Sequence, residues 1–194
     1  MIKIIYIYTY INKYKFMESN YTLGYWKIRG LGFHIRAVFE YVGVQYAIKD
    51  FVQGDGPEFS REQWYIEKPS LAMDFPNLPF LFDGELKISE TLAIMRHIAN
   101  KHDKTLLGKT VKDQATQDML LLVLHFKKGP ITSSCYNSPD KAVAKQIAYD
   151  SLPDIVHYLG KKPYLLGDYV TLADLYLLEM IDLIDFISDN EVFT

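Results

Sequence analysis

The sequence predicts two consecutive domains of different class, a small α/β domain and, after it, an all-helical domain. Strand-like and helix-like segments alternate from residue 21 to about residue 101. Beyond Gly108 the segments are long, helical in pattern and poor in strand-forming residues. The 194 residues are 49% hydrophobic and 23% charged, which is close to the average of globular proteins and permits a sizeable core.

The first domain begins with a strand, a helix and a second strand. YTLGYW, residues 21–26, is typical of a short strand. Apolar residues at helical spacing follow over residues 31–42, and Gly43 is a stop signal. Tyr46 and Ile48 then alternate as in a second strand.

A short helix, a hairpin and a longer helix complete this domain. We predict the short helix at about residues 59–67. NLPFLFDGELKIS reads as two strands joined at Asp83-Gly84, which is a strong signal for a hairpin turn. Ser89 can cap the next helix, which runs to about Lys101. The residues of this helix that should face inward are Ile94, Met95 and Ile98.

The resulting order, β-α-β-α-β-β-α, is that of a thioredoxin-like α/β domain. Its first half can form a parallel strand pair through a right-handed crossover, whereas the hairpin must be antiparallel. We place this domain at residues 18–101, a linker at 102–110 and the helical domain at 111–194. In the helical domain, Thr171 and Asp174 have the spacing of a capping box. The predicted helical segments are residues 111–127, 141–160 and 171–187.

The first residues differ in composition from the rest. Residues 1–16 consist almost wholly of Ile, Tyr, Asn and Lys, and a polar stretch from Met17 leads into the first strand. A weak signal peptide is one interpretation, but the tyrosines and the absence of a small-residue cleavage site argue against it. We interpret residues 1–17 as an extension that is disordered or spurious.

Composition and charge argue against several classes of function. The net charge is −3 and no run of Lys and Arg is present, which disfavours nucleic acid as a partner. No apolar run of about 20 residues occurs, so we expect no membrane span. The single cysteine, Cys135, fits a reducing, cytoplasmic location, and we expect it to be buried and inert. The five histidines show no metal-ligand spacing, so no metal is expected.

Seven segments, taken together, resemble a known family. They keep the family's order and nearly its spacing, and they are TLGYWKIRGL, REQW, EK, DFPNLPFLFDG, ISETLAIMRHIANKH, CYN and TLAD. These segments are similar to the cytosolic glutathione transferases, and most of all to the mu class, over residues 21–187. The resemblance implies a thioredoxin-like domain followed by a helical domain, with glutathione as co-substrate and no further cofactor.

The resemblance implies that Tyr25 is the catalytic residue. Its phenol would donate a hydrogen bond to the glutathione sulfur and favour the thiolate. Trp26 follows it as a further glutathione-binding residue. Leu31 starts the first helix, where a backbone amide would also reach toward the sulfur. Gly30 and Gly32 would permit the close approach. Taken alone, a tyrosine at a strand end is explained as readily by packing in the core.

The NLP segment, Asn77-Leu78-Pro79, is the next part of the implied glutathione site. The resemblance implies a cis bond before Pro79, so that the Leu78 backbone could pair with the cysteinyl residue of glutathione like an added strand. A trans proline in a turn is the alternative.

The mu pattern has Gln-Ser where this chain has Glu90 and Thr91. These two residues begin a helix whose amides would bind the γ-glutamyl carboxylate, and Glu90 would accept from the ammonium group. Glu90 could equally do no more than complement the helix dipole.

Arg61, Trp64 and Lys68 have spacings that place them on one face of the short helix. In the family this face meets the glycyl carboxylate of glutathione, with the lysine as charge partner and the indole as a hydrogen-bonding wall. Without the resemblance, such a group would be read as solvated surface.

The electrophile side departs further from the family pattern. The resemblance implies that Tyr136, in CYN, is a second catalytic residue that stabilises charge developing on the electrophile. Phe126 stands where the mu pattern has an acidic residue, and Gly129-Pro130 should break or kink the helix. Family members continue well past the last helix, whereas this chain ends at Thr194. We therefore expect an incomplete helical domain and electrophile site, with apolar surface exposed where a tail would pack.

The leading interpretation is a transferase that conjugates the glutathione thiolate to small hydrophobic electrophiles in detoxification. A non-catalytic glutathione-binding or structural member of the fold is one alternative, and a glutathione-dependent prostaglandin isomerase that uses the same tyrosine is another. A disulfide reductase is disfavoured, because it needs a cysteine where this chain has Tyr25. Since the family forms dimers through positions that match Phe75 and Arg96, we expect a homodimer.

Overall fold

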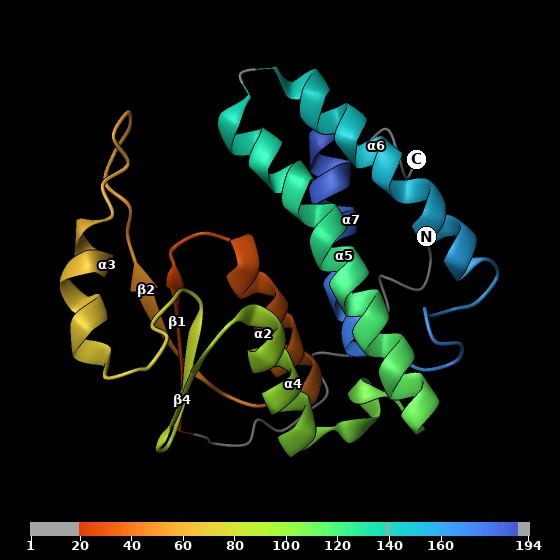
Figure 1. Ribbon diagram of the computed structural model, residues 1–194, viewed down its shortest axis with the longest axis horizontal. Helices are drawn as coiled ribbons and strands as arrows, with labels where there is room; N and C mark the ends of the chain where they lie inside the picture. Colours follow the sequence, from red (N-terminus) through yellow and green to blue (C-terminus); the bar gives the residue numbers. More distant parts are fainter. Residues whose placement is uncertain (1–19, 139, 190–194) are drawn as a thin grey trace. The chain divides into compact units, whose positions relative to one another are not determined.

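The computed structural model describes residues 20–138 and 140–189, and these divide into two compact units between Asp103 and Lys104 (Figure 1). The extension predicted at residues 1–17 lies outside the described residues. No helix in the described ranges combines the length and the apolar character that a membrane span requires.

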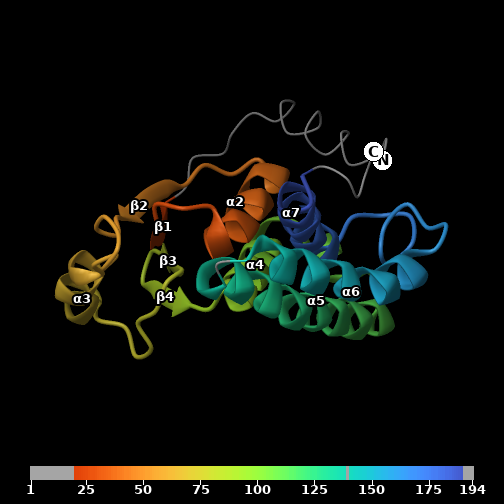
Figure 2. The ribbon, with the colours of Figure 1, turned by 90° about the horizontal axis from the view of Figure 1, so that it is seen from above.

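The first unit is a mixed four-stranded sheet with helices against it. In chain order its elements are β1 (Tyr21–Trp26), α2 (Gly30–Val42), β2 (Ala47–Phe51), α3 (Glu62–Glu67), a 3₁₀ helix (Lys68–Leu71), β3 (Phe80–Asp83), β4 (Leu86–Ser89) and α4 (Thr91–His102). Helices α2 and α4 pack side by side on one side of the sheet, and α3 lies on the other (Figures 1 and 2). The predicted β-α-β-α-β-β-α order is confirmed.

The strand order in the sheet is β2-β1-β3-β4. Strands β1 and β2 are parallel, whereas β1 pairs with β3 and β3 with β4 in antiparallel fashion. Gly84 has φ 60 at the turn between β3 and β4, a conformation that glycine adopts readily. Both the predicted parallel pair and the predicted hairpin are therefore present.

Helix α3 is shorter than the sequence predicted. It begins at Glu62 rather than near residue 59. Phe59 has φ 45, in the left-handed region, and a right-handed helix cannot include such a residue. The loop is closed instead by a hydrogen bond of 2.9 Å from the Gly54 amide to the Ser60 carbonyl.

Helix α4 confirms the predicted core residues but not the predicted cap. Ile94, Met95 and Ile98 are completely buried. Ser89, however, is the last residue of β4, and its hydroxyl donates to the Phe75 carbonyl at 2.7 Å. The N-cap position belongs to Glu90, so the prediction that Ser89 caps this helix is wrong.

The second unit consists of three helices after a short 3₁₀ turn. Its elements are a 3₁₀ helix (Lys104–Leu107), α5 (Val111–Asn137), α6 (Lys141–Leu159) and α7 (Leu172–Ile187). Each of α5, α6 and α7 packs against the other two. Every residue from Leu172 to Met180 is buried, so α7 forms the centre of this unit.

Capping boxes begin two of these helices. The predicted box of α7 is confirmed, since the Thr171 amide donates to Asp174 Oδ2 at 2.8 Å. A second box at the start of α5 was missed, although Thr110 and Asp113 have the same spacing. There the Thr110 amide donates to Asp113 Oδ2, and the Asp113 amide donates to Thr110 Oγ1, both at 3.1 Å.

A break or kink was predicted at Gly129-Pro130, but α5 runs through these residues to Asn137, so no break occurs. A proline inside a helix removes one N–H donor and crowds the carbonyl of the preceding turn, which disfavours the helix at this point. Lys128 and Ile131, on either side of this pair, are 4% and 0% exposed. Burial of these neighbours holds the segment in the helix that they share.

Candidate functional site

Tyr25 lies near the end of β1, and its side chain is only 6% exposed. Its hydroxyl oxygen accepts a hydrogen bond of 2.9 Å from the Leu31 backbone N–H. That amide belongs to the first turn of α2, where N–H groups have no partner within the helix. Because this bond uses the oxygen as acceptor, it leaves the phenolic proton to be donated elsewhere.

Two glycines permit this contact. A Cβ atom on Gly30 would lie 2.6 Å from the Tyr25 hydroxyl oxygen, and one on Gly32 would lie 2.6 Å from Tyr25 Cδ1. Both separations are shorter than a carbon can tolerate against another heavy atom. The two glycines thus allow the first turn of α2 to lie directly against Tyr25, whereas the approach of this turn to the glutathione sulfur stays a prediction.

The sheet and α3 bring several predicted site residues into one apolar cluster. The buried members of this cluster are Tyr25, Phe51, Trp64, Leu71, Leu78 and Phe80. Trp26 and Leu31, both partly buried, pack against it. The Phe51 ring meets the Trp64 indole edge-on, with centroids 5.2 Å apart. Residues separated by more than fifty positions in the chain thus share one packed surface beneath the candidate site.

The three residues predicted on one face of α3 have different surroundings. The Trp64 side chain is 5% exposed and belongs to the core. The Lys68 ammonium lies 5.7 Å from the centroid of the Trp64 ring, within reach of a cation–π contact. Arg61 is exposed at the N-cap position of the helix. Of the two cations, Lys68 is the one that the structure places against the indole ring.

The peptide bond between Leu78 and Pro79 is cis, as predicted. Asn77, the preceding residue, donates from Nδ2 to Glu90 Oε1 at 3.2 Å. This bond joins the NLP segment to the start of α4. The sequence predicts Asn77 and Glu90 as separate site residues but not the link between them, because thirteen positions separate them and no local pattern pairs them.

Glu90 has φ 74 and ψ 117, which is a sparsely populated conformation for any residue other than glycine. Such backbone costs of the order of 1–3 kcal/mol and persists only where the surroundings enforce it, most often at ligand sites. Thr91, directly after it, is 4% exposed and starts α4. The amides of this first turn lie beside the Asn77–Glu90 pair.

The helical unit carries the remaining predicted residue. Tyr136 lies near the end of α5, and its side chain is 72% exposed. Phe126, on the same helix, is 73% exposed. Cys135 was expected to be buried but is exposed. The residues around it in the chain, Thr132-Ser133-Ser134 and Asn137, are polar, which is typical of an exposed stretch of helix.

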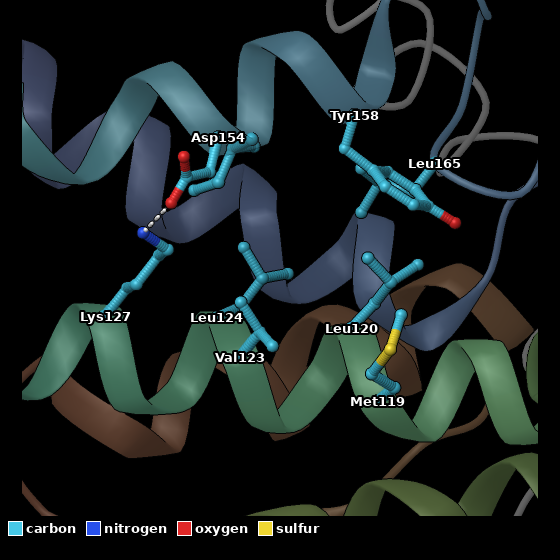
Figure 3. A pocket seen from close by; sticks show the side chains of 9 residues that line it. Met119, Leu120, Val123, Leu124, Lys127, Asp154, Tyr158 and Leu165 are labelled. Carbon is cyan, nitrogen blue, oxygen red and sulfur yellow. Dashed lines mark hydrogen bonds and ion pairs between the residues drawn. The ribbon is translucent and has the colours of Figure 1, made fainter.

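The helical unit also contains an apolar cavity of about 150 Å³ between α5 and α6 (Figure 3). Its lining residues are Met119, Leu120, Val123, Leu124, Lys127, Asp154, Ile155, Tyr158 and Leu165. Lys127 and Asp154 form an ion pair of 2.9 Å at its edge. None of the predicted site residues lines it, and the sequence analysis did not anticipate it.

Comparison with known proteins agrees with this arrangement. The model of the glutathione S-transferase N-terminal domain matches residues 21–100, and that of the C-terminal domain matches residues 127–194. Glutathione S-transferase Mu 2 of Macaca fuscata fuscata is 40% identical over 176 residues, which cover 89% of this chain and 77% of that protein. The Homo sapiens Mu 2 protein is 39% identical over 176 residues, with the same shares covered.

A solved structure of a C. elegans-specific glutathione transferase has a TM-score of 0.73 and 26% identity to this chain, covering 91% of this chain and 85% of that one. Sequence and fold therefore lead to the same family across both units. The chain belongs to the glutathione S-transferase family, as a mu-like glutathione transferase.

Proposed function

We propose that this transferase conjugates glutathione to small hydrophobic electrophiles, as in detoxification, with Tyr25 as hydrogen-bond donor to the sulfur. The supporting observation is the bond of 2.9 Å from the Leu31 amide to the Tyr25 oxygen. A phenol oxygen that accepts a bond from a backbone amide still carries its own proton, and a phenol can donate and accept at the same time. The thiolate would be stabilised by this donor, and no general base is required.

One hydrogen bond can supply the free energy that is needed to stabilise the thiolate. A free thiol has a pKa of about 8.5, so only a small fraction is ionised at neutral pH. Lowering that value by about two units requires roughly 3 kcal/mol of differential stabilisation. A hydrogen bond to a charged acceptor in a sheltered site contributes about that amount.

The rest of the glutathione molecule would be held at three places. The Leu78 backbone would pair with the cysteinyl residue, next to the cis proline. The start of α4, with Glu90 and Thr91, would take the γ-glutamyl end, and the strained backbone of Glu90 supports a binding role there. Lys68 and Arg61 would attract the glycyl carboxylate, beside the packed Trp64 ring.

The electrophile would be contacted by Tyr136, whose exposed hydroxyl can donate to charge that develops during attack.

We further propose a cytoplasmic homodimer. Phe75 is 82% exposed, so its ring is accessible to a second subunit. This ring and Arg96 match the positions that the family uses between subunits.

The test is an ultraviolet absorbance titration of bound glutathione in the parent protein and in Tyr25→Phe. We expect a thiolate band at neutral pH in the parent and its loss in the variant, with a fall in conjugation rate of at least about tenfold. Tyr149→Phe, a change of the same size in α6, is the control and should resemble the parent. Glutathione binding without turnover in the parent would favour the non-catalytic alternative. A thiolate band that survives Tyr25→Phe would refute the assigned role.

A further inference from the structure

We propose that Arg36 is a positioning residue for the sulfur end of the site, and this inference rests on the proposed role of Tyr25. From α2 it holds the turn between β1 and α2, so that the Leu31 amide stays in place on the Tyr25 hydroxyl. Arg36 would touch neither glutathione nor the electrophile. It would act through the backbone of this turn.

The guanidinium of Arg36 bridges two successive carbonyls of the turn. Its Nη2 donates to the Arg29 oxygen at 2.9 Å and to the Ile28 oxygen at 3.2 Å. A helical side chain points back toward the N-terminus of its helix, which gives a residue two turns into α2 the direction to reach these carbonyls. Hydrogen bonds from a charged donor are among the stronger ones in proteins.

Arg29 and Ile28 are the residues immediately before α2, so their position sets where the helix begins. Gly30 and Leu31 follow directly, and Leu31 carries the amide that bonds Tyr25. Arg29 occupies the N-cap position of α2 and makes no side-chain capping bond, as far as the described residues show. Arg36, from within α2, thus stabilises the N-terminal end of this helix, which the side chain of the N-cap residue Arg29 does not cap.

A second observation connects the guanidinium to the tyrosine ring. A Cβ atom added to Gly32 would lie 2.6 Å from Tyr25 Cδ1 and 2.9 Å from Arg36 Nη1. The ring and the guanidinium therefore both lie against the same glycine. When Arg36 is lost, the first turn of α2 can move relative to the ring, and the Leu31–Tyr25 bond is the contact that this movement weakens.

The guanidinium of arginine suits this task better than the ammonium of lysine. Both bonds come from Nη2, whose two N–H groups are fixed in the guanidinium plane, whereas an ammonium is a compact, strongly hydrated charge. Arg36→Lys should therefore restore only part of what Arg36→Met removes. Lys27→Met is the matched control, because it deletes an exposed cation from the same turn without touching these carbonyls.

The first measurement is amide hydrogen exchange at Leu31, which needs no ligand. We expect Arg36→Met to speed exchange of this amide on the order of tenfold, with a smaller effect in Arg36→Lys and none in Lys27→Met. The Val38 amide, in the buried part of α2, should keep its parental rate. An unchanged Leu31 rate would overturn the proposal. An equal acceleration at Val38 would also overturn it, because it would show a general loss of stability.

The second measurement is the thiol pKa of bound glutathione, read from the thiolate absorbance. We expect a rise of about 0.5 to 1 unit in Arg36→Met, an intermediate rise in Arg36→Lys and no change in Lys27→Met. A parental value in Arg36→Met, with Leu31 exchange accelerated, would overturn the sulfur role and leave a purely structural clamp. Absence of a thiolate in the parent itself would refute the proposed function, and with it the sulfur role.

Discussion

The helices of the two units begin in opposite ways. In the helical unit, side chains close the helix starts: Thr110 with Asp113 at α5, Asp140 at α6, and Thr171 with Asp174 at α7. In the α/β unit, the N-cap residues of α2 and α4, Arg29 and Glu90, make no such bond within the described residues. The closed starts stabilise the unit that holds them. At α2 the Leu31 amide is bonded instead by the hydroxyl of Tyr25, a side chain from β1, and at α4 the first turn begins with Thr91.

This contrast indicates that some helix N-termini in this chain stabilise the fold, whereas others contribute to the candidate binding site. A side-chain cap satisfies an amide permanently and removes it from any ligand. At α2 the Leu31 amide holds the Tyr25 phenol that would meet the thiolate, and at α4 the strained Glu90 backbone precedes the amides that would meet a carboxylate.

The largest effect is expected at the buried capping box. Asp174 accepts bonds from the Leu165 amide at 2.8 Å, from the Thr171 amide at 2.8 Å and from the Thr171 hydroxyl at 2.7 Å. Asp174→Ala would leave these donors buried without an acceptor, and we expect a loss of about 3 kcal/mol in the free energy of unfolding. Asp113→Ala, in the exposed box of α5, should cost only about 1 kcal/mol. Urea denaturation measures both, and equal losses would contradict the role of burial.

An added methyl group in the first turn of α2 should lower the stability of the protein, whereas one inside α5 should raise it. Gly32→Ala places a carbon against the Tyr25 ring, and we expect a loss of about 1–3 kcal/mol together with slower conjugation. Gly129, inside α5, has nothing within 4 Å of its added Cβ, so Gly129→Ala should stabilise by up to about 1 kcal/mol. Thermal unfolding and the rate with a chloronitrobenzene report both changes. Stabilisation by Gly32→Ala would show that the close approach is not a constraint.

The smallest effect is expected in the second half of α4, where two side chains of the helix bond to Asp83 of β3. Asp83 accepts from His97 Nε2 at 2.7 Å and from Lys101 Nζ at 2.6 Å. Partial burial alone would raise the pKa of Asp83, but the bonds and charges of Lys101 and His97 outweigh it and hold the pKa below its usual value. Since the pKa is lower in the folded state, this stabilisation is present above the unfolded pKa of about 4 and is lost as the pH falls through the folded value.

Asp83→Asn should therefore cost less than about 1 kcal/mol at pH 7, because Lys101 remains largely in solvent. Below pH 4 the difference between parent and variant should shrink toward zero. Urea denaturation at the two pH values measures it. A difference that grows as the pH falls would contradict the assigned direction of the shift.

Local patterns in the sequence were sufficient for much of the fold. The strand and helix order, the hairpin at Asp83-Gly84, and the Thr171–Asp174 box depend on residues close together in the chain, and the structure confirms them. Predictions of local structure were wrong where a residue far along the chain, or the burial of neighbouring side chains, determined the conformation instead. Ser89 is engaged by the Phe75 carbonyl, and the turn around Pro130 remains helical between buried residues.

The sequence by itself therefore determined the elements and, through family resemblance, the names of the candidate site residues. Only the tertiary structure decided how those residues meet. It brings Tyr25, Trp64 and Leu78 into one cluster, joins Asn77 to Glu90, and brings Arg36 back onto the turn before its own helix. The physical reason is the distance along the chain over which each kind of interaction acts. Propensity and capping act over a few residues, whereas packing and hydrogen bonds between distant segments exist only once the chain has folded.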